Sequence, residues 1–277
     1  MSVVVTGATG HLGRLIVEAL LRNGMPAGDI VAAGRNTAKL AELEELGVRV
    51  ARIDLDEPAS LDAAFAGAET VMLVSGSEPG KRLPQHRAVI DAAKAAGVAR
   101  IVYTSVTDAR KTSLVLAPEH KATEEYLEES GVPFTVLRNN WYHENYDGTV
   151  AQARATGTVV TSTGQGRVAS ASRADYADAA AVVLASDGHE GKVYELGGDT
   201  AWDFAEFAAQ VGATFENVTP EAHAEILAGA GLDAGTATFV VALDEGIRNG
   251  TLGNPTSDLS DLIGRPTTPL AAYLASR

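Results

Sequence analysis

The sequence contains no cysteine among its 277 residues. Disulfide bonds, thiol catalysis and cysteine-ligated metals are therefore excluded, and the composition fits a reducing compartment. No apolar run approaches the roughly 18 residues that a membrane-spanning helix needs. The first residues lack a basic segment followed by a cleavable apolar one, so they do not resemble a secretory signal. We expect a cytoplasmic protein with no membrane partner.

Basic residues are scarce, with 22 Lys and Arg against 36 Asp and Glu, which gives a formal net charge of -14. Nucleic acids and anionic membranes are bound by clustered Lys and Arg, so neither is expected as a partner. An anionic ligand would have to be held by a local positive site. His143, His189 and His223 show no metal-ligand spacing, and no metal is expected.

The first half of the chain alternates between two kinds of segment. Short runs rich in valine and isoleucine, typical of buried strands, begin at Val3, Asp29, Val48, Thr70, Ala99 and Phe134. Segments with apolar residues at helical spacing lie between them, at 12–23, 37–46, 61–66, 85–96 and 119–130. This alternation predicts an α/β fold in which a doubly wound parallel Rossmann sheet has helices on both faces.

The pattern changes after residue 140, where an aromatic cluster, WYHENY, is followed by a stretch rich in Gly and Thr. A helix beginning near SRADYADAAAVVLAS and a strand at KVYELGG come next, and a looser tail follows. We expect residues 1–140 to form the Rossmann domain, with 165–198 returning to it. Residues 141–164 and 199–277 would form a smaller C-terminal substrate lobe.

Three glycines, Gly7, Gly10 and Gly13, lie between the first strand and the first helix in TGATGHLG. In such a turn the first glycine permits the tight bend, the second lets backbone approach a phosphate, and the third lets helix and strand pack closely. A pyrophosphate would then rest on the N–H groups at the start of the helix. The spacing differs by one residue from the common G-x-G-x-x-G, and a tight turn without a ligand is the alternative.

The second strand ends in AGR, without the Asp or Glu that would bind the ribose 2′-OH of NAD. Arg35 there offers a fork of donors to a 2′-phosphate, and Lys39 could add a second charge one turn later. NADP(H) is therefore the expected dinucleotide. The alternative is that Arg35 is an ordinary surface residue. Asp54, at the end of the third strand, is placed to accept from the adenine amino group or to cap the next helix, and Asp56 is the stronger candidate for the cap.

Small polar residues close the next two strands. Ser75, Gly76 and Ser77 follow the fourth strand, and Thr104 and Ser105 end the fifth. Because ligands of open α/β sheets bind at the carboxyl ends of the strands, cofactor contacts are expected at these residues.

The proton-donating pair of the short-chain dehydrogenases is missing. None of the seven tyrosines is followed four residues later by Lys. Ser105 matches the position of the serine that accompanies this pair. The helix that should carry the pair instead places His120 and Glu124 four residues apart. His120 is the candidate for the lost donor, and Lys121 is the alternative.

Several further motifs together point to one family: SGSEPGKRLPQHR at 75–87, YTS at 103–105, LRNNWYHENY, ASASRADYA, GKVYELGGD and IGRPTTPL. With TGATGHLG and GRN, they resemble the NmrA-like atypical short-chain dehydrogenases/reductases, and among these the flavin-free bacterial NADPH:quinone oxidoreductases. The resemblance covers nearly the whole chain. It implies NADPH bound through Gly7, Thr9, Gly10, His11, Leu12, Arg35 and the loop at 75–77.

The resemblance also implies a quinone site against the nicotinamide, lined by the aromatic cluster. Quinone reduction produces a stabilised phenolate, so a strong general acid is less necessary than for an ordinary ketone. Orientation of the rings and a hydrogen bond to the developing oxyanion remain. The candidate donors are Asn140, Tyr142 and Asn139. Trp141 and Tyr146 could contact a flat substrate or pack in the core, and His86 could contact substrate or be a hydrogen-bonded histidine at a helix start.

Two other functions stay open at this point. The substrate could be an enone or an imine-like electrophile instead of a quinone. The chain could also be a non-catalytic NADP(H) sensor of the NmrA type, because a sensor does not need the missing Tyr and Lys. A closed apolar cavity facing the nicotinamide would favour an enzyme. A homodimer is one expected oligomeric state.

Overall fold

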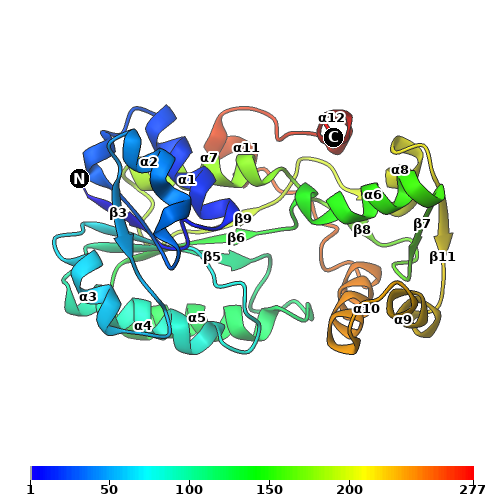
Figure 1. Ribbon diagram of the computed structural model, residues 1–277, viewed down its shortest axis with the longest axis horizontal. Helices are drawn as coiled ribbons and strands as arrows, with labels where there is room; N and C mark the ends of the chain where they lie inside the picture. Colours follow the sequence, from blue (N-terminus) through cyan, green and yellow to red (C-terminus); the bar gives the residue numbers. More distant parts are fainter. Residues whose placement is uncertain (1) are drawn as a thin grey trace.

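The computed structural model describes residues 2–277 of the chain, and its main feature is a seven-stranded parallel sheet (Figure 1). The strand order is β3-β2-β1-β4-β5-β6-β9. The strands are β1 (Val3–Val5), β2 (Ile30–Gly34), β3 (Arg49–Arg52), β4 (Thr70–Leu73), β5 (Arg100–Val106), β6 (Phe134–Asn139) and β9 (Val193–Leu196). The order reverses at β1, which lies between β2 and β4, so the carboxyl end of β1 is the expected place for a ligand.

Helices cover both faces of this sheet (Figure 1). One face carries α1 (His11–Arg22), α2 (Ala41–Glu45), α7 (Arg173–Ala185) and α11 (Asp258–Ile263). The other carries α3 (Ala59–Phe65), α4 (Arg82–Ala95) and α5 (Ala117–Ser130). Short 3-10 turns are η1 (Ala27–Asp29), η2 (Thr37–Leu40) and η3 (His143–Tyr146). The sequence prediction of a doubly wound α/β fold is confirmed.

Strand β1 shows why both faces need covering. Successive side chains of a strand point to opposite faces, and all three residues of β1 are apolar. Val3 and Val5 pack into the core beneath α1 and α7, whereas Val4 packs into the core beneath α3, α4 and α5. A strand that is apolar at every position is stable only between two layers of helices.

The remaining elements gather beyond the end of β6. They are α6 (Asp147–Thr156), β7 (Thr158–Thr161), β8 (Arg167–Val168), β10 (Trp202–Asp203), α8 (Phe204–Gln210), β11 (Thr214–Asn217), α9 (Pro220–Gly229), α10 (Ala234–Arg248) and α12 (Leu270–Ala275). Two small sheets pair β10 with β8 and β11 with β7. A third apolar core joins these elements and includes Trp202, Phe204 and Phe207.

Two helices differ from the sequence prediction. The helix expected at 37–46 is split into η2 and α2, a short piece with only Leu40 and Leu43 buried. Helix α11 lies in the range expected for the substrate lobe, yet it packs against α7 and β9 through Leu259. The division of the chain into a domain and a lobe stays a prediction. Within residues 2–277, no helix is long and apolar enough to cross a membrane.

Candidate active site

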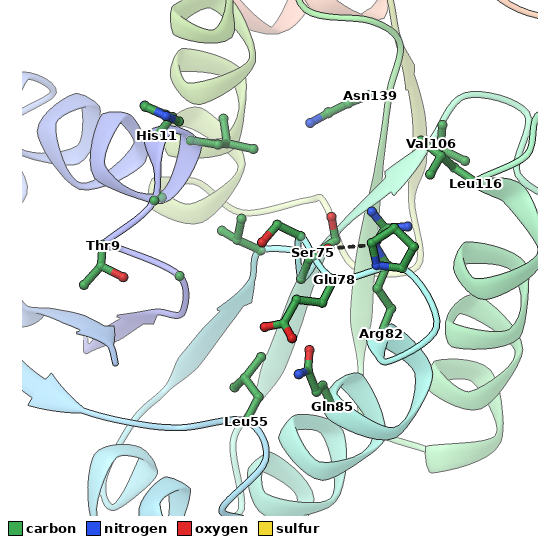
Figure 2. Close-up of a pocket in the computed structure, with 18 of the residues that line it drawn as sticks. Thr9, His11, Leu55, Ser75, Glu78, Arg82, Gln85, Val106, Leu116 and Asn139 are labelled. Atoms are coloured by element: carbon green, nitrogen blue, oxygen red, sulfur yellow. Dashed lines mark hydrogen bonds between the residues drawn. The ribbon is translucent and has the colours of Figure 1, made fainter. Parts of the chain in front are cut away.

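A cavity of about 750 Å³ opens at the carboxyl ends of β1, β2, β4, β5 and β6 (Figure 2). All the residues predicted to bind cofactor line it, except Thr104. In Figure 2, His11 lies on one side of the cavity and Val106 and Leu116 on the other, with Asn139 between them. The cavity is thus continuous from the glycine turn to an apolar wall.

The glycine turn is closed by contacts that no larger residue would allow. Gly7 has a φ of +64°, in the left-handed region. A Cβ on Gly13 would lie 2.3 Å from the carbonyl oxygen of Gly7. Gly10 is the N-cap of α1 and has no side chain to accept from the first turn. The N–H groups at the start of α1 are therefore available to an anion in the cavity.

The charged end of the cavity is formed by Arg35, Lys39 and Asp54. Arg35 follows β2 with its side chain 61% exposed, and its Nη1 lies 3.2 Å from Oε1 of Glu78. Asp54 Oδ1 accepts from the Asp56 N–H at 3.1 Å, within a turn. The expectation that Asp56 caps the next helix is wrong, because α3 has Pro58 as its N-cap and Asp56 accepts from Gln85 instead.

The loop at 75–77 is held from behind by two residues that do not line the cavity. The Ser75 N–H donates to Thr104 Oγ1 at 2.8 Å, and the Gly76 N–H donates to His86 Nε2 at 3.0 Å. His86 is fully buried, and burial lowers its pKa to about 3, so the ring stays neutral. The structure therefore does not bring His86 or Thr104 to the cavity surface, because both are used to anchor the loop.

His120 lies on α5 and lines the cavity with only 4% of its surface exposed. Its Nδ1 is 2.7 Å from the hydroxyl oxygen of Tyr103, which is fully buried. A buried phenol that kept its hydrogen unpaired would cost about 1–3 kcal/mol, so we assign Tyr103 as the donor to Nδ1. Nε2 then carries the hydrogen of the neutral ring. Burial, helped by the positive charge of Arg82, lowers the pKa of His120 to about 3.

Glu124, one turn beyond His120, anchors a buried polar network. It accepts from Ser105 Oγ at 2.7 Å and from two nitrogens of Arg138 at 2.9 and 2.7 Å. Burial would raise the pKa of Glu124, but these hydrogen bonds outweigh it and hold the pKa below its ordinary value. Because Ser105 donates its hydrogen to an ionised carboxylate, it can only accept from a molecule in the cavity. Lys121 is not part of the cavity lining, and its Nζ lies 4.0 Å from Oε1 of Glu125.

The amide side chain of Asn140 lines the cavity but is already bonded to protein. Its Nδ2 donates to the Leu252 carbonyl at 3.3 Å, and its Oδ1 accepts from the Trp141 N–H at 2.7 Å. The amide nitrogen carries a second hydrogen beyond the one donated to Leu252, so Asn140 stays a predicted donor to the substrate.

Asn139 and Tyr142 each keep a polar group that is free to form a hydrogen bond with a ligand. The Tyr142 hydroxyl accepts from Asn139 Nδ2 at 3.0 Å, which leaves the hydroxyl hydrogen free to donate. Burial raises the pKa of Tyr142, so this group stays protonated. Asn139 Oδ1 is buried without a hydrogen-bond partner in the described part of the chain. An unpaired buried oxygen beside a cavity is typical of a ligand site.

The aromatic cluster divides between the cavity and the core. Trp141 lines the cavity. Tyr146 does not: its ring packs edge-on against Trp202 and Phe204, at centroid distances of 5.1 and 5.6 Å. The short turn η3 directs Tyr146 into this apolar core, so the structure places it away from the expected substrate site.

Other lining residues were not expected from the sequence, namely Glu78, Arg82, Gln85, Val106, Leu116, Asn145, Arg173 and Phe239. Phe239 lies on α10, a hundred residues after β6, so only tertiary packing could bring it here. Arg173 is the first residue of α7, and its guanidinium lies 5.0 Å from the centre of the Tyr142 ring. Its position in the SRADYA motif was the available signal.

Comparison with known proteins agrees with this geometry. A family model described as NAD(P)H-binding matches residues 7–187. Quinone oxidoreductase 2 of Escherichia coli is 45% identical over 275 residues, which are 97% of this chain and 96% of that protein.

Two solved structures are similar over the full fold. The crystal structure of the Escherichia coli NADPH-dependent quinone oxidoreductase QOR2 complexed with NADPH has a TM-score of 0.96 and 44% identity, covering 99% of each chain. The Citrobacter sp. triphenylmethane reductase complexed with NADP(H) has a TM-score of 0.95 and 34% identity, covering 100% of this chain and 99% of that one. The glycine turn, the Rossmann sheet and these matches show that the chain belongs to the NAD(P)H-binding family, as one of its NmrA-like members.

Proposed function

We propose that this chain is an NADPH-dependent oxidoreductase that reduces quinones in one two-electron step, without flavin. The observation that carries this proposal is one continuous cavity that joins a dinucleotide turn to an apolar wall. Val106, Leu116, Trp141 and Phe239 form that wall. A cofactor sensor would not need such a wall, whereas an apolar substrate does. The similarity to a quinone oxidoreductase over nearly the whole chain supports the same substrate class.

The residues present fit NADPH. The space between Gly13 and Gly7 is too narrow for any side chain, and the uncapped start of α1 faces the cavity. These features suit a pyrophosphate, while Arg35 and Lys39 suit a 2′-phosphate. They also provide the local positive site that a chain with a net charge of -14 would need for an anionic ligand.

When bound, NADPH would supply a hydride to the quinone, and the resulting hydroquinone monoanion would take one proton from solvent to give the hydroquinone. The chain holds the substrate ring and stabilises the negative charge that develops on its oxygen. We assign that role to the neutral His120 through Nε2–H, with the Tyr142 hydroxyl as a second donor. Ser105 cannot donate, because its hydrogen is bonded to Glu124. Trp141 contributes a flat surface for the quinone ring.

The remaining expectations stay proposals. We propose a cytoplasmic location, a homodimeric state, and the division into a Rossmann domain (1–140 with 165–198) and a substrate lobe (141–164 with 199–277).

The test is oxidation of NADPH by the purified, flavin-free protein with and without a simple benzoquinone. An enone and an imine-like electrophile serve as alternative substrates. Rapid turnover with benzoquinone supports the proposal. Tight NADPH binding without turnover on any quinone would contradict it and favour the sensor.

A further inference from the structure

We propose that Glu78, in the loop after β4, sets the preference between NADPH and NADH together with Arg35. The inference rests on the proposed cofactor site, and it goes beyond the assignment of the 2′-phosphate to Arg35 alone. When no 2′-phosphate is bound, the Glu78 carboxylate would pair with Arg35, the residue expected to bind that phosphate.

The two side chains meet across the cavity. Arg35 Nη1 lies 3.2 Å from Glu78 Oε1, and Lys81 Nζ lies 3.0 Å from the other carboxylate oxygen. Arg35 follows β2 and Glu78 follows β4, the two strands that flank β1 in the sheet. The ion pair therefore bridges the carboxyl end of β1, where the glycine turn begins. Figure 2 shows the Glu78 carboxylate extending from the loop at Ser75 into this space.

The backbone on both sides of Glu78 is anchored. The N–H groups of Gly80 and Arg82 donate to the Glu119 carboxylate at 3.1 Å, and Arg82 Nε donates to the Gly76 carbonyl at 2.7 Å. The loop therefore holds Glu78 at the cavity, and the side chain is the part free to change partner. The hydrogen bond from Lys81 keeps the pKa of Glu78 below its ordinary value, so the carboxylate is ionised at neutral pH.

The chemistry of the two cofactors differs at this point. A carboxylate accepts a hydrogen bond from the ribose 2′-OH of NADH, the role that an acid at the end of β2 plays in many NAD sites. Strand β2 ends here in Arg35 without an acid, and Glu78 supplies one from another strand. A 2′-phosphate would be repelled by the same carboxylate and would have to displace it from Arg35. Lys81, on the far side, provides a partner to which the displaced Glu78 can stay bonded.

The test is direct binding of NADPH and NADH to wild-type protein and Glu78→Gln, measured by cofactor fluorescence at low salt. Removing the charge should lower the Kd for NADPH about two- to five-fold, since exposed ion pairs are weak. It should raise the Kd for NADH about two- to ten-fold, through the weaker hydrogen bond to the 2′-OH. Glu57→Gln is the matched control, because Glu57 pairs with Arg52 at 3.5 Å in an exposed position outside the cavity.

Opposite shifts for the two cofactors in Glu78→Gln, with none in the control, would support the proposal. Equal shifts, no shift, or weaker NADPH binding would overturn it. Because the readout is binding, the proposal can hold even if no quinone is reduced, and it can fail while quinone reduction proceeds. High salt should shrink the NADPH effect, since Arg35 is exposed and Glu78 is partly exposed to solvent.

Discussion

Removal of the His120 donor should slow catalysis while leaving cofactor binding intact. A hydrogen bond to a neutral carbonyl contributes about 0.5–1.5 kcal/mol, and one to a charged oxygen about 1.5–3 kcal/mol. The difference, roughly 1–1.5 kcal/mol, is the part that favours the transition state over bound substrate. His120→Leu should therefore lower kcat with benzoquinone about 5- to 13-fold, with little change in the KM for NADPH.

The structure also predicts how this variant affects stability. His120→Leu removes the ring nitrogen to which the buried Tyr103 hydroxyl donates, which should cost about 1–3 kcal/mol of unfolding free energy. Tyr103→Phe combined with His120→Leu removes both partners and should recover much of that loss, although kcat stays low. His120→Gln retains an N–H donor and should keep more activity than His120→Leu.

The assay is steady-state NADPH oxidation at saturating cofactor, alongside urea unfolding of each variant. Activity that recovers in the double variant together with stability would refute a role in catalysis and leave His120 a structural residue. An unchanged kcat in His120→Leu would refute it as well. A kcat that falls steeply above pH 6.5 in wild-type protein would show a charged histidine donor instead of the neutral ring assigned here.

Four other outcomes follow from the structure. In Gly13→Ala, the added Cβ would lie 2.3 Å from a carbonyl oxygen of the glycine turn, so NADPH binding measured by fluorescence should be lost; retained affinity would contradict the turn's role. Glu124→Gln removes the buried carboxylate that pairs with Arg138, which keeps only its second partner Glu195, and should cost about 3 kcal/mol in urea unfolding; a loss within error would show the network contributes little. Arg35→Ala should raise the KM for NADPH about ten-fold with NADH little affected; an equal rise for both would remove Arg35 from the phosphate site. His86 and His120 have folded pKa values of about 3, below the ordinary value, so the unfolded chain binds more protons than the folded one between pH 6.5 and 3. The free energy of unfolding should therefore fall as the pH drops through that window, by on the order of 1 kcal/mol per pH unit for each histidine. A thermal midpoint that stays constant across this window would contradict this expectation.

Local sequence was sufficient for the fold class and the dinucleotide turn. The all-apolar strands, the helical spacing between them and the glycines of TGATGHLG are dictated by neighbours in the chain. A strand that is buried on both faces must be apolar throughout, and a turn with a left-handed residue and a close backbone approach must use glycine. For that reason the parallel sheet could be predicted, and so could the end of the sheet at which the cavity lies.

The roles of individual polar side chains depended on tertiary structure. His86 and Thr104 have the right chemistry for a site, but they bond to the loop at 75–77 from behind the cavity. Asn140 lines the cavity, and one of its bonds is to a carbonyl 112 residues away. Tyr146 lies only five residues after Trp141 and contributes to the same apolar core, yet of the two only Trp141 also lines the cavity.

The rest of the cavity lining depends on residues that the sheet and the C-terminal elements bring together. Phe239 reaches the cavity from α10, and Glu78 meets Arg35 across the end of β1. Sequence determined where a ligand can bind, because backbone geometry is local. Tertiary structure decided which side chains remain free to contact it, because hydrogen-bond partners and burial are set by residues distant in the chain.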